Sequence, residues 1–397
     1  MNLKQFLQFK RITQLDFAKK LNISPISLSR YIGKERLPEK NILLKIYNLT
    51  DGLVSPNDFY LNNETQMQLG FNKIKEIKNL AKNIKLGKRK YLGKAITMIE
   101  SSLEEDQQAT QFLLNQFKRN DNSIRIGITG VPGVGKSTFI ESLGLKLINE
   151  GLRVAVLAID PSSKKSGGSI LGDKTRMERL SVNPNAFIRP SPSDGHLGGV
   201  AKKTSESILC LEESNFDVIF VETMGVGQAE TAVYDMVDIF LLLLLPSGGD
   251  ELQGIKKGII ELANLIIVNK ADNGLKKQAE ITQREYINAI NIKNNSRKEE
   301  KIDVLTCSSL ESKGFEKIWK YIKKFVELRK KNQKFFQNRQ SQRSKWMWNA
   351  VNLKTRDYIQ KDLKFRTFTK KIQNDVEKNL LGIVEASDII LSFITKK

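Results

Sequence analysis

The sequence predicts an α/β fold built on a mostly parallel, doubly wound sheet. Seven short apolar runs alternate with helical patterns from Ile124 onward, and each run has the length and the Val, Ile and Leu content of a strand. The runs are IRIGITG, RVAVLAID, AFIRPSP, FDVIFVET, IFLLLLLP, LIIVNKAD and IDVLTCSS. Such alternation is typical of βαβ units and a parallel sheet. The most apolar run, Ile239 to Leu245, has seven residues. A membrane-spanning helix needs about 20, so this run predicts a central strand buried on both faces.

The chain of 397 residues is expected to hold more than one domain. Strand-like runs are missing before Asp121 and after about Lys331, where lysine-rich helical patterns replace them. We therefore predict a small all-α unit (1–62), a linker and helical arm (63–120), an α/β domain (121–330) and a C-terminal helical arm (331–397). In the last of these, Trp346, Met347, Trp348 and Val351 have the spacing of an apolar helical stripe, which we expect to be core or an oligomer contact.

The amino-acid composition limits which kinds of binding and catalysis the chain can carry out. The net charge of +21 fits nucleic-acid binding, but the excess is spread along the chain, which favours solvated lysines. Two cysteines, Cys210 and Cys307, make no disulfide framework, and the first residues lack a secretory apolar segment, so we expect a cytoplasmic protein. A single histidine argues against Ser-His-Asp catalysis and histidine-rich metal sites. Hydroxyls, carboxylates, lysine and backbone amides remain, and these groups suit phosphate chemistry.

A phosphate-binding loop is predicted at GVPGVGKS, which matches GxxxxGK[ST], follows a strand and opens an amphipathic helix. The glycines let backbone amides curl around phosphates, and the helix N-terminus favours an anion. Lys136 is expected to reach the β- and γ-phosphates, and the Ser137 hydroxyl to bind Mg²⁺. The expected nucleotide contacts in this P-loop are Gly130, Gly133, Val134, Gly135, Lys136, Ser137 and Thr138.

Three carboxylates follow predicted strands and are candidate Mg²⁺ ligands: Asp160, Asp173 and Glu222. Asp160 and Asp173 could instead be loop caps or solvated turn residues. Glu222 begins ETMG, which fits a strand-end acid followed by a glycine, Gly225, close to the γ-phosphate. We assign catalytic roles to Lys136, Glu222 and Gly225.

The residue after Gly225 is Val226, where small signalling GTPases carry a glutamine that orients water. Gln228 lies two residues further on and could substitute only if the loop rearranges. We therefore predict slow intrinsic hydrolysis that a partner accelerates.

The motif NKAD follows the strand LIIV and predicts a guanine site. Asp272 can accept hydrogen bonds from guanine N1 and N2, Lys270 can lie over the base, and Asn269 can tie the loop to the P-loop. Ser308 and Ser309 follow the last strand, where backbone amides would meet the base oxygen. The predicted ligand is GTP with Mg²⁺.

Longer runs resemble the methylmalonyl-CoA mutase-associated GTPases of the MeaB/ArgK family. They are VAVLAIDPSSKKSGGSILGDKTRM, IRPSPSDGHLGGVAKKT, VETMGVGQAE and LPSGGDELQGIKKG. The likeness extends from near Lys85 to about Trp348, about two thirds of the chain. It implies a GTPase chaperone that protects or loads an adenosylcobalamin-dependent methylmalonyl-CoA mutase. It also makes Asp160, Asp173 and Glu222, with Ser137, the Mg²⁺ and switch residues.

By the same likeness, the loop from Pro246 to Lys257 is a third switch that couples the nucleotide state to the mutase. Gln253 and Lys256 fall where that family carries coupling residues. Without the likeness, a solvated loop would be the simpler interpretation. The C-terminal helices resemble the family's dimerisation arm loosely, and this likeness implies a homodimer.

The first sixty residues lie outside this likeness and resemble a helix-turn-helix of the Cro-repressor type. Gln14, Phe17, Ala18 and Leu21 would build the first helix, residues 22–24 the turn, and residues 25–32 the recognition helix. Ser27 and Arg30, with Ser29 nearby, would face the major groove, and Lys34 and Arg36 would lie on phosphates. The alternatives are a fold that binds no DNA, or two neighbouring genes joined in one reading frame.

Two other functions stay open. One is a DNA-binding regulator whose GTPase domain senses nucleotide. The other is a metal-insertion GTPase, as in nickel delivery, which the lack of a histidine-rich tract disfavours.

Overall fold

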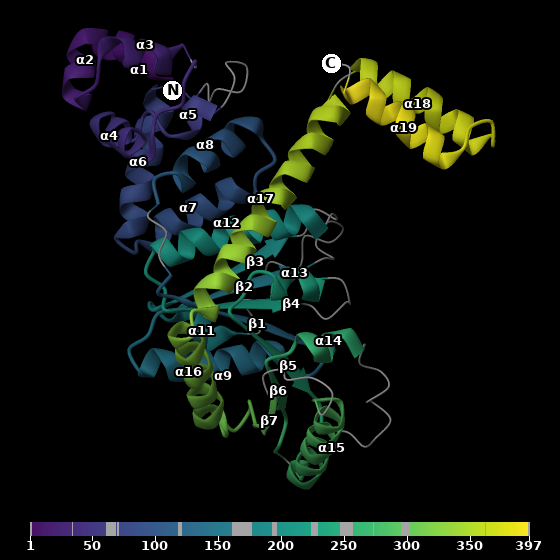
Figure 1. The fold of residues 1–397 in the computed structure, drawn as a ribbon. Coiled ribbons are helices and arrows are strands. Elements are labelled where there is room, and N and C mark those ends of the chain that lie inside the picture. Colours follow the sequence, from purple (N-terminus) through teal and green to yellow (C-terminus); the bar gives the residue numbers. More distant parts are fainter. Residues whose placement is uncertain are drawn as a thin grey trace. The chain divides into compact units, whose positions relative to one another are not determined.

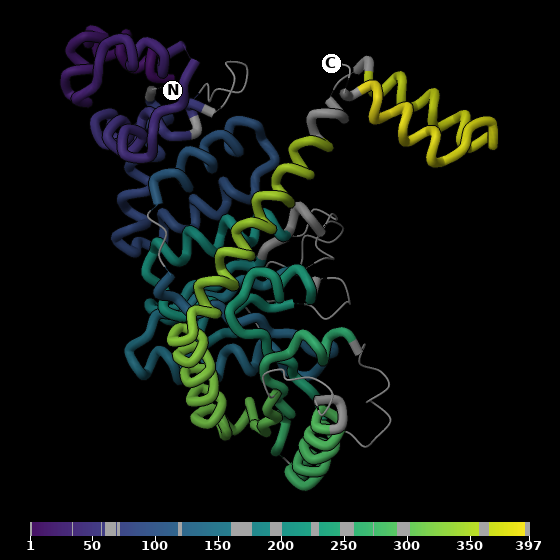
Figure 2. The backbone as a smooth tube through the Cα atoms, viewed as in Figure 1, coloured from purple at the N-terminus to yellow at the C-terminus, as the bar shows by residue number. Residues whose placement is uncertain are grey.

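The computed structural model describes residues 2–33, 35–60, 69, 71–117, 121–160, 177–192, 197–223, 229–246, 257–272, 274–294, 302–361 and 363–395. The chain divides into two compact units. One contains residues 1–123 and 206–219, and the other contains residues 124–205 and 220–397. Figure 2 follows the chain through both units.

Seven parallel strands form one sheet in the order β3-β2-β4-β1-β5-β6-β7 (Figure 1). Their bounds are β1 Ile124–Gly130, β2 Val154–Asp160, β3 Ala186–Pro192, β4 Val218–Thr223, β5 Ile239–Leu244, β6 Leu265–Val268 and β7 Asp303–Thr306. Each strand falls inside one of the seven predicted runs, so the predicted fold class is confirmed. The two prolines of β3, Pro190 and Pro192, lie on an edge strand, where a missing N–H costs no ladder hydrogen bond.

The sheet is most apolar at its centre. All six residues of β5 are buried, as the sequence predicted for a strand covered on both faces. One apolar cluster joins β5, β6 and β7 to helix α15 (Lys276–Asn294), with Leu242, Ile266 and Val304 on the sheet and Tyr286 and Ile290 on the helix. This packing fixes the strand ends from which the nucleotide loops emerge.

In the α/β unit a helix follows each of the strands β1 to β6, and the last helices follow β7 in succession. The helices of this unit are α9 Lys136–Asn149, α11 Glu178–Val182, α12 Leu197–Glu213 (shared with the first unit), α13 Ala229–Tyr234, α14 Lys257–Leu262, α15 Lys276–Asn294, α16 Phe315–Lys331, α17 Lys334–Lys361, α18 Leu363–Glu377 and α19 Ile383–Thr395. Among the described residues, no helix is both long enough and apolar enough to cross a membrane.

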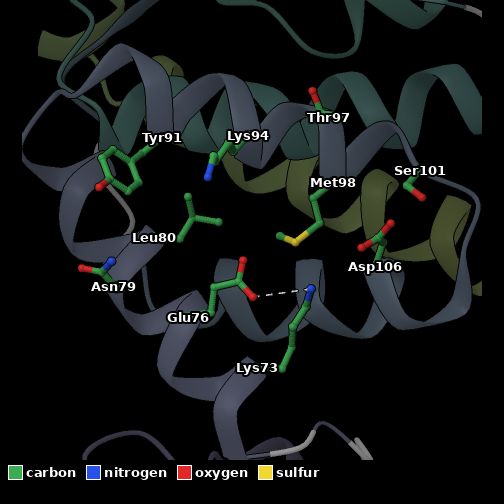
Figure 3. A pocket seen from close by; sticks show the side chains of 10 residues that line it. All are labelled: Lys73, Glu76, Asn79, Leu80, Tyr91, Lys94, Thr97, Met98, Ser101 and Asp106. Atoms are coloured by element: carbon green, nitrogen blue, oxygen red, sulfur yellow. Dashed lines mark ion pairs between the residues drawn. The ribbon is translucent and has the colours of Figure 1, made fainter.

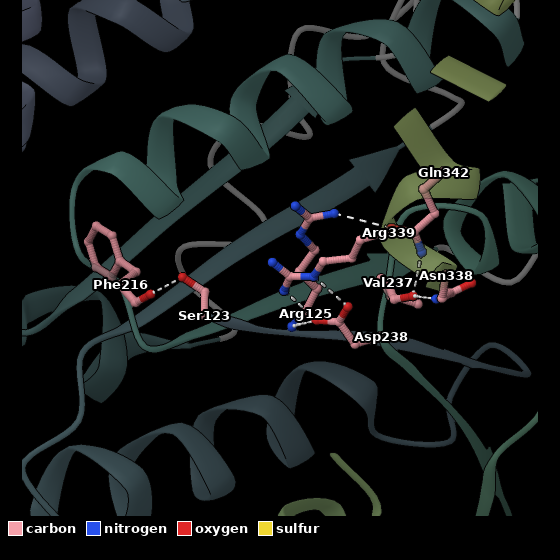
Figure 4. Close-up of polar contacts among 8 residues, drawn as sticks. All are labelled: Ser123, Arg125, Phe216, Val237, Asp238, Asn338, Arg339 and Gln342. Atoms are coloured by element: carbon pink, nitrogen blue, oxygen red, sulfur yellow. Dashed lines mark hydrogen bonds and ion pairs between the residues drawn. The ribbon is translucent and has the colours of Figure 1, made fainter. Parts of the chain in front are cut away.

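A buried ion pair anchors α17 to the strands (Figure 4). Arg339 donates from Nε to Asp238 Oδ1 at 2.9 Å and from Nη2 to Asp238 Oδ2 at 2.7 Å. The backbone N–H of Arg125, in β1, donates to the same carboxylate at 2.9 Å. Gln342 adds a bond from Nε2 to the Val237 carbonyl at 2.7 Å. Each polar group of this interior network therefore has a partner, as burial requires.

The first unit begins with five short helices that share an apolar core. They are α1 Leu3–Lys10, α2 Gln14–Leu21, α3 Pro25–Ile32, α4 Lys40–Leu49 and α5 Asn57–Tyr60. The core consists of Leu3, Phe6, Leu7, Phe17, Ala18, Leu21, Leu28, Tyr31, Ile46, Val54 and Phe59. Three further helices follow, α6 Phe71–Lys85, α7 Arg89–Glu100 and α8 Glu104–Leu114, and all three pack on one another.

Candidate nucleotide-binding site

The predicted P-loop connects the end of β1 to the start of α9. Two glycines show why the motif needs them. A Cβ on Gly130 would lie 2.5 Å from the Leu243 carbonyl oxygen, and Gly135 has φ +90°, a left-handed conformation that favours glycine. A Cβ on Gly135 would also lie 2.9 Å from Asn269 Nδ2. The loop is therefore compact, with its backbone close to both the sheet and the base loop.

Lys136 is held inside this loop. Its side chain is only 8% exposed, and its ammonium donates to the Gly130 carbonyl at 2.8 Å and to the Val131 carbonyl at 3.3 Å. The loop thus positions one positive charge at the start of α9, where the helix N-terminus also favours an anion. Both features suit a bound phosphate.

Ser137 and Glu222 come together from distant parts of the chain. The Ser137 hydroxyl donates to Glu222 Oε1 at 3.1 Å, and Glu222 is 4% exposed near the end of β4. A hydroxyl beside a carboxylate is an oxygen pair of the kind Mg²⁺ prefers. One residue further on, Thr223 Oγ1 lies 2.9 Å from Thr129 Oγ1 and joins the ends of β4 and β1.

Asn269 links three loops. Its Nδ2 donates to the Val134 carbonyl at 2.9 Å, which is the tie to the P-loop expected from the motif. Its Oδ1 accepts from the Ser309 hydroxyl at 2.7 Å and from the Ser309 backbone N–H at 3.1 Å. Because Asn269 is 1% exposed, these bonds are shielded from water and fix the loops against one another.

The base-side residues lie beside this amide. Ser308 Oγ donates to the Asp272 carboxylate, and Lys270 has φ +56° in the left-handed region. Cys307 is buried, and burial raises the pKa of its thiol to about 12, so a nucleophilic thiolate does not form near neutral pH. The hydrogen bond from Ser308 therefore orients the Asp272 carboxylate, which the motif predicts to accept from a guanine base.

Other predicted site residues have simpler positions. Gly133 has φ +80°, Val134 is buried, and Thr138 is exposed in the first turn of α9. Asp160 ends β2, and the structure does not describe its side chain. Asp173, Gly225, Val226, Gln228, Gln253 and Lys256 lie outside the described residues.

One site residue was missed from the sequence. Ser142 Oγ, in α9, donates to the Ser309 carbonyl at 2.7 Å and so joins the P-loop helix to the last guanine loop. A lone serine within a helix gives no sequence signal for such a contact, because its partner is 167 positions away.

A separate cavity of about 440 Å³ lies in the first unit, between α6, α7 and the start of α8 (Figure 3). Leu80 and Met98 give it an apolar wall, and Lys73 lies 3.7 Å from Glu76 within it. None of the predicted site residues lines it.

The strand, phosphate loop and helix, joined through Asn269 to a base loop of the NKAD type, define a P-loop GTPase. Comparison with known proteins gives the family. Residues 92–363 match the family model described as methylmalonyl Co-A mutase-associated GTPase MeaB, so the chain belongs to the MeaB family. The family assignment and the fold class agree with the resemblance found in the sequence.

Three relatives illustrate the match. A "Putative GTPase" of Caulobacter vibrioides is 46% identical over 80% of this chain and 97% of its own length. "GTPase ArgK" of Escherichia coli is 41% identical over 78% and 95%. The mouse "Methylmalonic aciduria type A homolog, mitochondrial" is 40% identical over 77% and 76%.

A solved structure agrees. The crystal structure titled "LAO/AO transport system kinase" is 33% identical, with a TM-score of 0.64, and covers 82% of this chain and 99% of its own. The relatives' names support GTP hydrolysis as the activity of this chain.

Proposed function

We propose that this GTPase binds an adenosylcobalamin-dependent methylmalonyl-CoA mutase and uses GTP binding and hydrolysis to protect that enzyme or to control its cofactor loading. The observation that carries the proposal is the family match, which includes both nucleotide loops and is described as mutase-associated. The geometry of the site supports the part of the proposal that concerns GTP binding and hydrolysis. The partner half rests on the family.

Different residues of the site would bind different parts of the nucleotide. Lys136 supplies a fixed positive charge beside the phosphates. A positive charge held there stabilises the negative charge that develops on the phosphoryl group during transfer. Asp272 selects guanine, because guanine offers N–H donors where adenine does not. Asn269 holds the two loops at a fixed separation.

The Ser137–Glu222 pair fits Mg²⁺ by the chemistry of its two oxygens. We propose that Ser137 and Glu222 hold the ion, with Asp160 and Asp173 as further candidates. The ion would neutralise phosphate charge when bound. Gly225 would bring its backbone close to the γ-phosphate, and Gln253 and Lys256 would report the nucleotide state to the mutase.

We also propose a homodimer formed by the C-terminal arm. Of the predicted apolar stripe, Trp346 packs inward, with its ring 5.3 Å from the Arg125 guanidinium and its Nε1 donating to the Asp235 carbonyl at 3.3 Å. The other three residues lie on the surface, since Met347 is 52%, Trp348 59% and Val351 42% exposed. These residues share one face of α17, at positions i, i+1 and i+4. Of the two roles expected for the stripe, the exposure of these three residues favours an oligomer contact.

Co-elution with the mutase tests the proposed partner. The purified chain is mixed with an adenosylcobalamin-dependent methylmalonyl-CoA mutase and separated by size-exclusion chromatography, with GDP or with a non-hydrolysable GTP analogue. We expect a complex whose yield depends on the nucleotide. In parallel, the chain should slow inactivation of the mutase during turnover.

The double variant Gln253→Ala/Lys256→Ala should bind GTP like the parent chain and lose the nucleotide dependence of the complex. Absence of any complex in either nucleotide state would refute the partner assignment and leave the GTPase assignment intact.

A further inference from the structure

The helices α1 to α5 form a part of the chain that the GTPase function does not use. They precede residue 92, where the family match begins, and they have their own apolar core. Their composition is basic, with ten lysines and arginines against five aspartates and glutamates in residues 1–60. A folded, basic element outside the GTPase motifs is suited to bind a negatively charged partner.

Local contacts build a tight turn between α2 and α3. Asn22 ends α2 in the left-handed conformation, with φ 56°, and its backbone N–H donates to the carbonyls of Ala18 and Lys19. Ser24 Oγ accepts from the Ser27 backbone N–H at 3.1 Å and caps α3, with Pro25 in the first turn. Two helices joined by three residues in this way have the form of a helix-turn-helix.

The third helix, α3, has two different faces. Leu28 and Tyr31 are buried in the shared core at 0% and 5% exposure. The exposed residues Pro25, Ile26, Ser29 and Arg30 form a second face, because their positions i, i+1, i+4 and i+5 fall on one side of the helix. Ser27, expected to face a groove, is instead half-buried, and its hydroxyl lies 2.9 Å from Ser24 Oγ. Ile26 and Ser29, rather than Ser27, accompany Arg30 on the outer face.

The chemistry of this outer face matches base edges in a DNA major groove. The Arg30 side chain is 59% exposed, and its nearest ionic partner, Glu35, is 4.0 Å away and 70% exposed. An exposed pair at this distance holds the guanidinium weakly, so it remains available to bind guanine O6 and N7. Ile26, at 68% exposure, offers an apolar side chain one turn earlier, of the kind that contacts a thymine methyl.

Positive charge continues onto α1 and α2. Lys19 and Lys20 are exposed in the last turn of α2. Lys4 and Arg11 line a hollow of about 290 Å³, shared with Thr13 and Gln14 at the start of α2. In a helix-turn-helix the first helix of the motif crosses the DNA backbone, where lysine and arginine side chains meet phosphates.

We propose that residues 2–60 bind duplex DNA, with α3 in the major groove and with Arg30 and Ile26 reading a guanine and a neighbouring thymine. Duplex DNA is favoured over a protein partner because the exposed face combines one fork-shaped donor and one apolar contact with surrounding lysines, instead of a continuous apolar patch. This activity is separate from the proposed mutase function.

The test uses the full chain. Fluorescently labelled duplexes with a randomised centre are selected for binding, and the enriched sequence is measured by fluorescence anisotropy over a range of KCl concentrations. We expect log Kd to rise linearly with log [KCl] because bound lysines and arginines release counterions. We expect Arg30→Ala to weaken binding of the enriched sequence by about 5- to 150-fold.

Two further variants separate base reading from charge. Arg30→Lys keeps the charge but loses the fork, so it should bind mixed-sequence duplexes like the parent chain while losing preference at the guanine. Ile26→Ala should relax preference at the thymine. Lys90→Gln, an exposed charge removed from α7, should leave Kd within about twofold. All variants should retain the parent chain's GTP affinity and circular dichroism.

Three results would overturn the proposal: no duplex binding at low salt, equal binding of single-stranded DNA or RNA, or an equal loss of affinity in Lys90→Gln and Arg30→Ala. None of them bears on whether the chain binds the mutase.

Discussion

At the scale of single residues, Asn269 shows how one side chain can organise a site. Its side-chain amide forms hydrogen bonds with two other loops. It donates to the Val134 carbonyl and accepts from both the hydroxyl and the backbone N–H of Ser309. Replacing it would leave several buried groups without partners at once, and each such loss is costly. Asn269 is therefore a positioning residue, while the groups expected to touch nucleotide are its neighbours.

Asp272→Asn tests guanine selection. The substitution keeps the size of the side chain but removes the carboxylate that would accept two guanine N–H groups. We expect the affinity for GTP to fall about 100-fold, because hydrogen bonds to a charged acceptor are among the stronger ones. The affinity for xanthosine triphosphate should rise, since its C2 oxygen accepts from the new amide.

Titration with fluorescent nucleotides measures both changes. Asp303→Asn, at the start of β7, is the control and should bind GTP normally. Equal loss of GTP affinity in the two variants would contradict the role given to Asp272.

Glu222→Gln tests the metal assignment. Removing the charge beside Ser137 should raise the Mg²⁺ concentration for half-maximal hydrolysis by about 10- to 100-fold. A Mg²⁺ titration of GTP turnover gives this value, and EDTA should abolish turnover in the parent chain. Asp217→Asn, an exposed carboxylate before β4, serves as the matched control. An unchanged Mg²⁺ requirement in Glu222→Gln would exclude Glu222 from the ion.

At the scale of elements, the attachment of α17 depends on a pair of charges that burial makes costly to break. The Arg339 and Asp238 side chains are 0% and 1% exposed, and two hydrogen bonds join them. Such a pair adds little stability over a well-packed apolar contact, but the loss of one partner leaves a buried, uncompensated charge. The position of the C-terminal arm on the α/β unit therefore depends strongly on this contact.

Arg339→Ala should lower the free energy of unfolding of the α/β unit by about 3 to 5 kcal/mol. Lys345→Ala removes an ion pair with Asp235 whose side chains are 54% and 39% exposed, and it should cost less than about 1 kcal/mol. Urea unfolding followed by circular dichroism compares the two. Similar midpoints for both variants would show that the buried pair does not anchor the helix.

Elements were easier to predict from the sequence than contacts. All seven strands were predicted, six of them because they are short runs of β-branched and aliphatic residues, and β3, AFIRPSP, because it lies in the same alternation with helical patterns. Asn269 was expected to tie two loops because its motif has a known physical role. Arg339 and Ser142 were not, because an isolated charge or hydroxyl in a helix carries no sign of a partner more than 100 positions away.

The pair of helices α2 and α3 shows how far the sequence could predict single residues. The sequence placed α2, the turn and α3 with the observed bounds, since Asn22, Ser24 and Pro25 are strong local signals. It could not decide which hydroxyl of α3 faces outward. Ser27 was expected there, but the cap formed with Ser24 uses it, and Ser29 is exposed instead.

At the scale of the whole molecule, the exposed stripe on α17 bears on assembly. Trp348→Glu should convert the proposed homodimer to a monomer, because a charge on a buried apolar contact must be desolvated without a partner. Asn349→Glu adds the same charge on the opposite face of the helix and should leave the assembly unchanged. Analytical ultracentrifugation distinguishes the two states. A parent chain that sediments as a monomer at micromolar concentration would rule the dimer out.

The measurement that tests the central claim most directly is the rate of GTP hydrolysis by the purified chain, alone and with an adenosylcobalamin-dependent methylmalonyl-CoA mutase. With Val226 in place of a water-orienting glutamine, we predict slow turnover by the chain alone and a clear increase when the mutase is added. Tight GTP binding with a rate that the mutase leaves unchanged, or fast turnover without it, would contradict the claim that this GTPase works through a mutase.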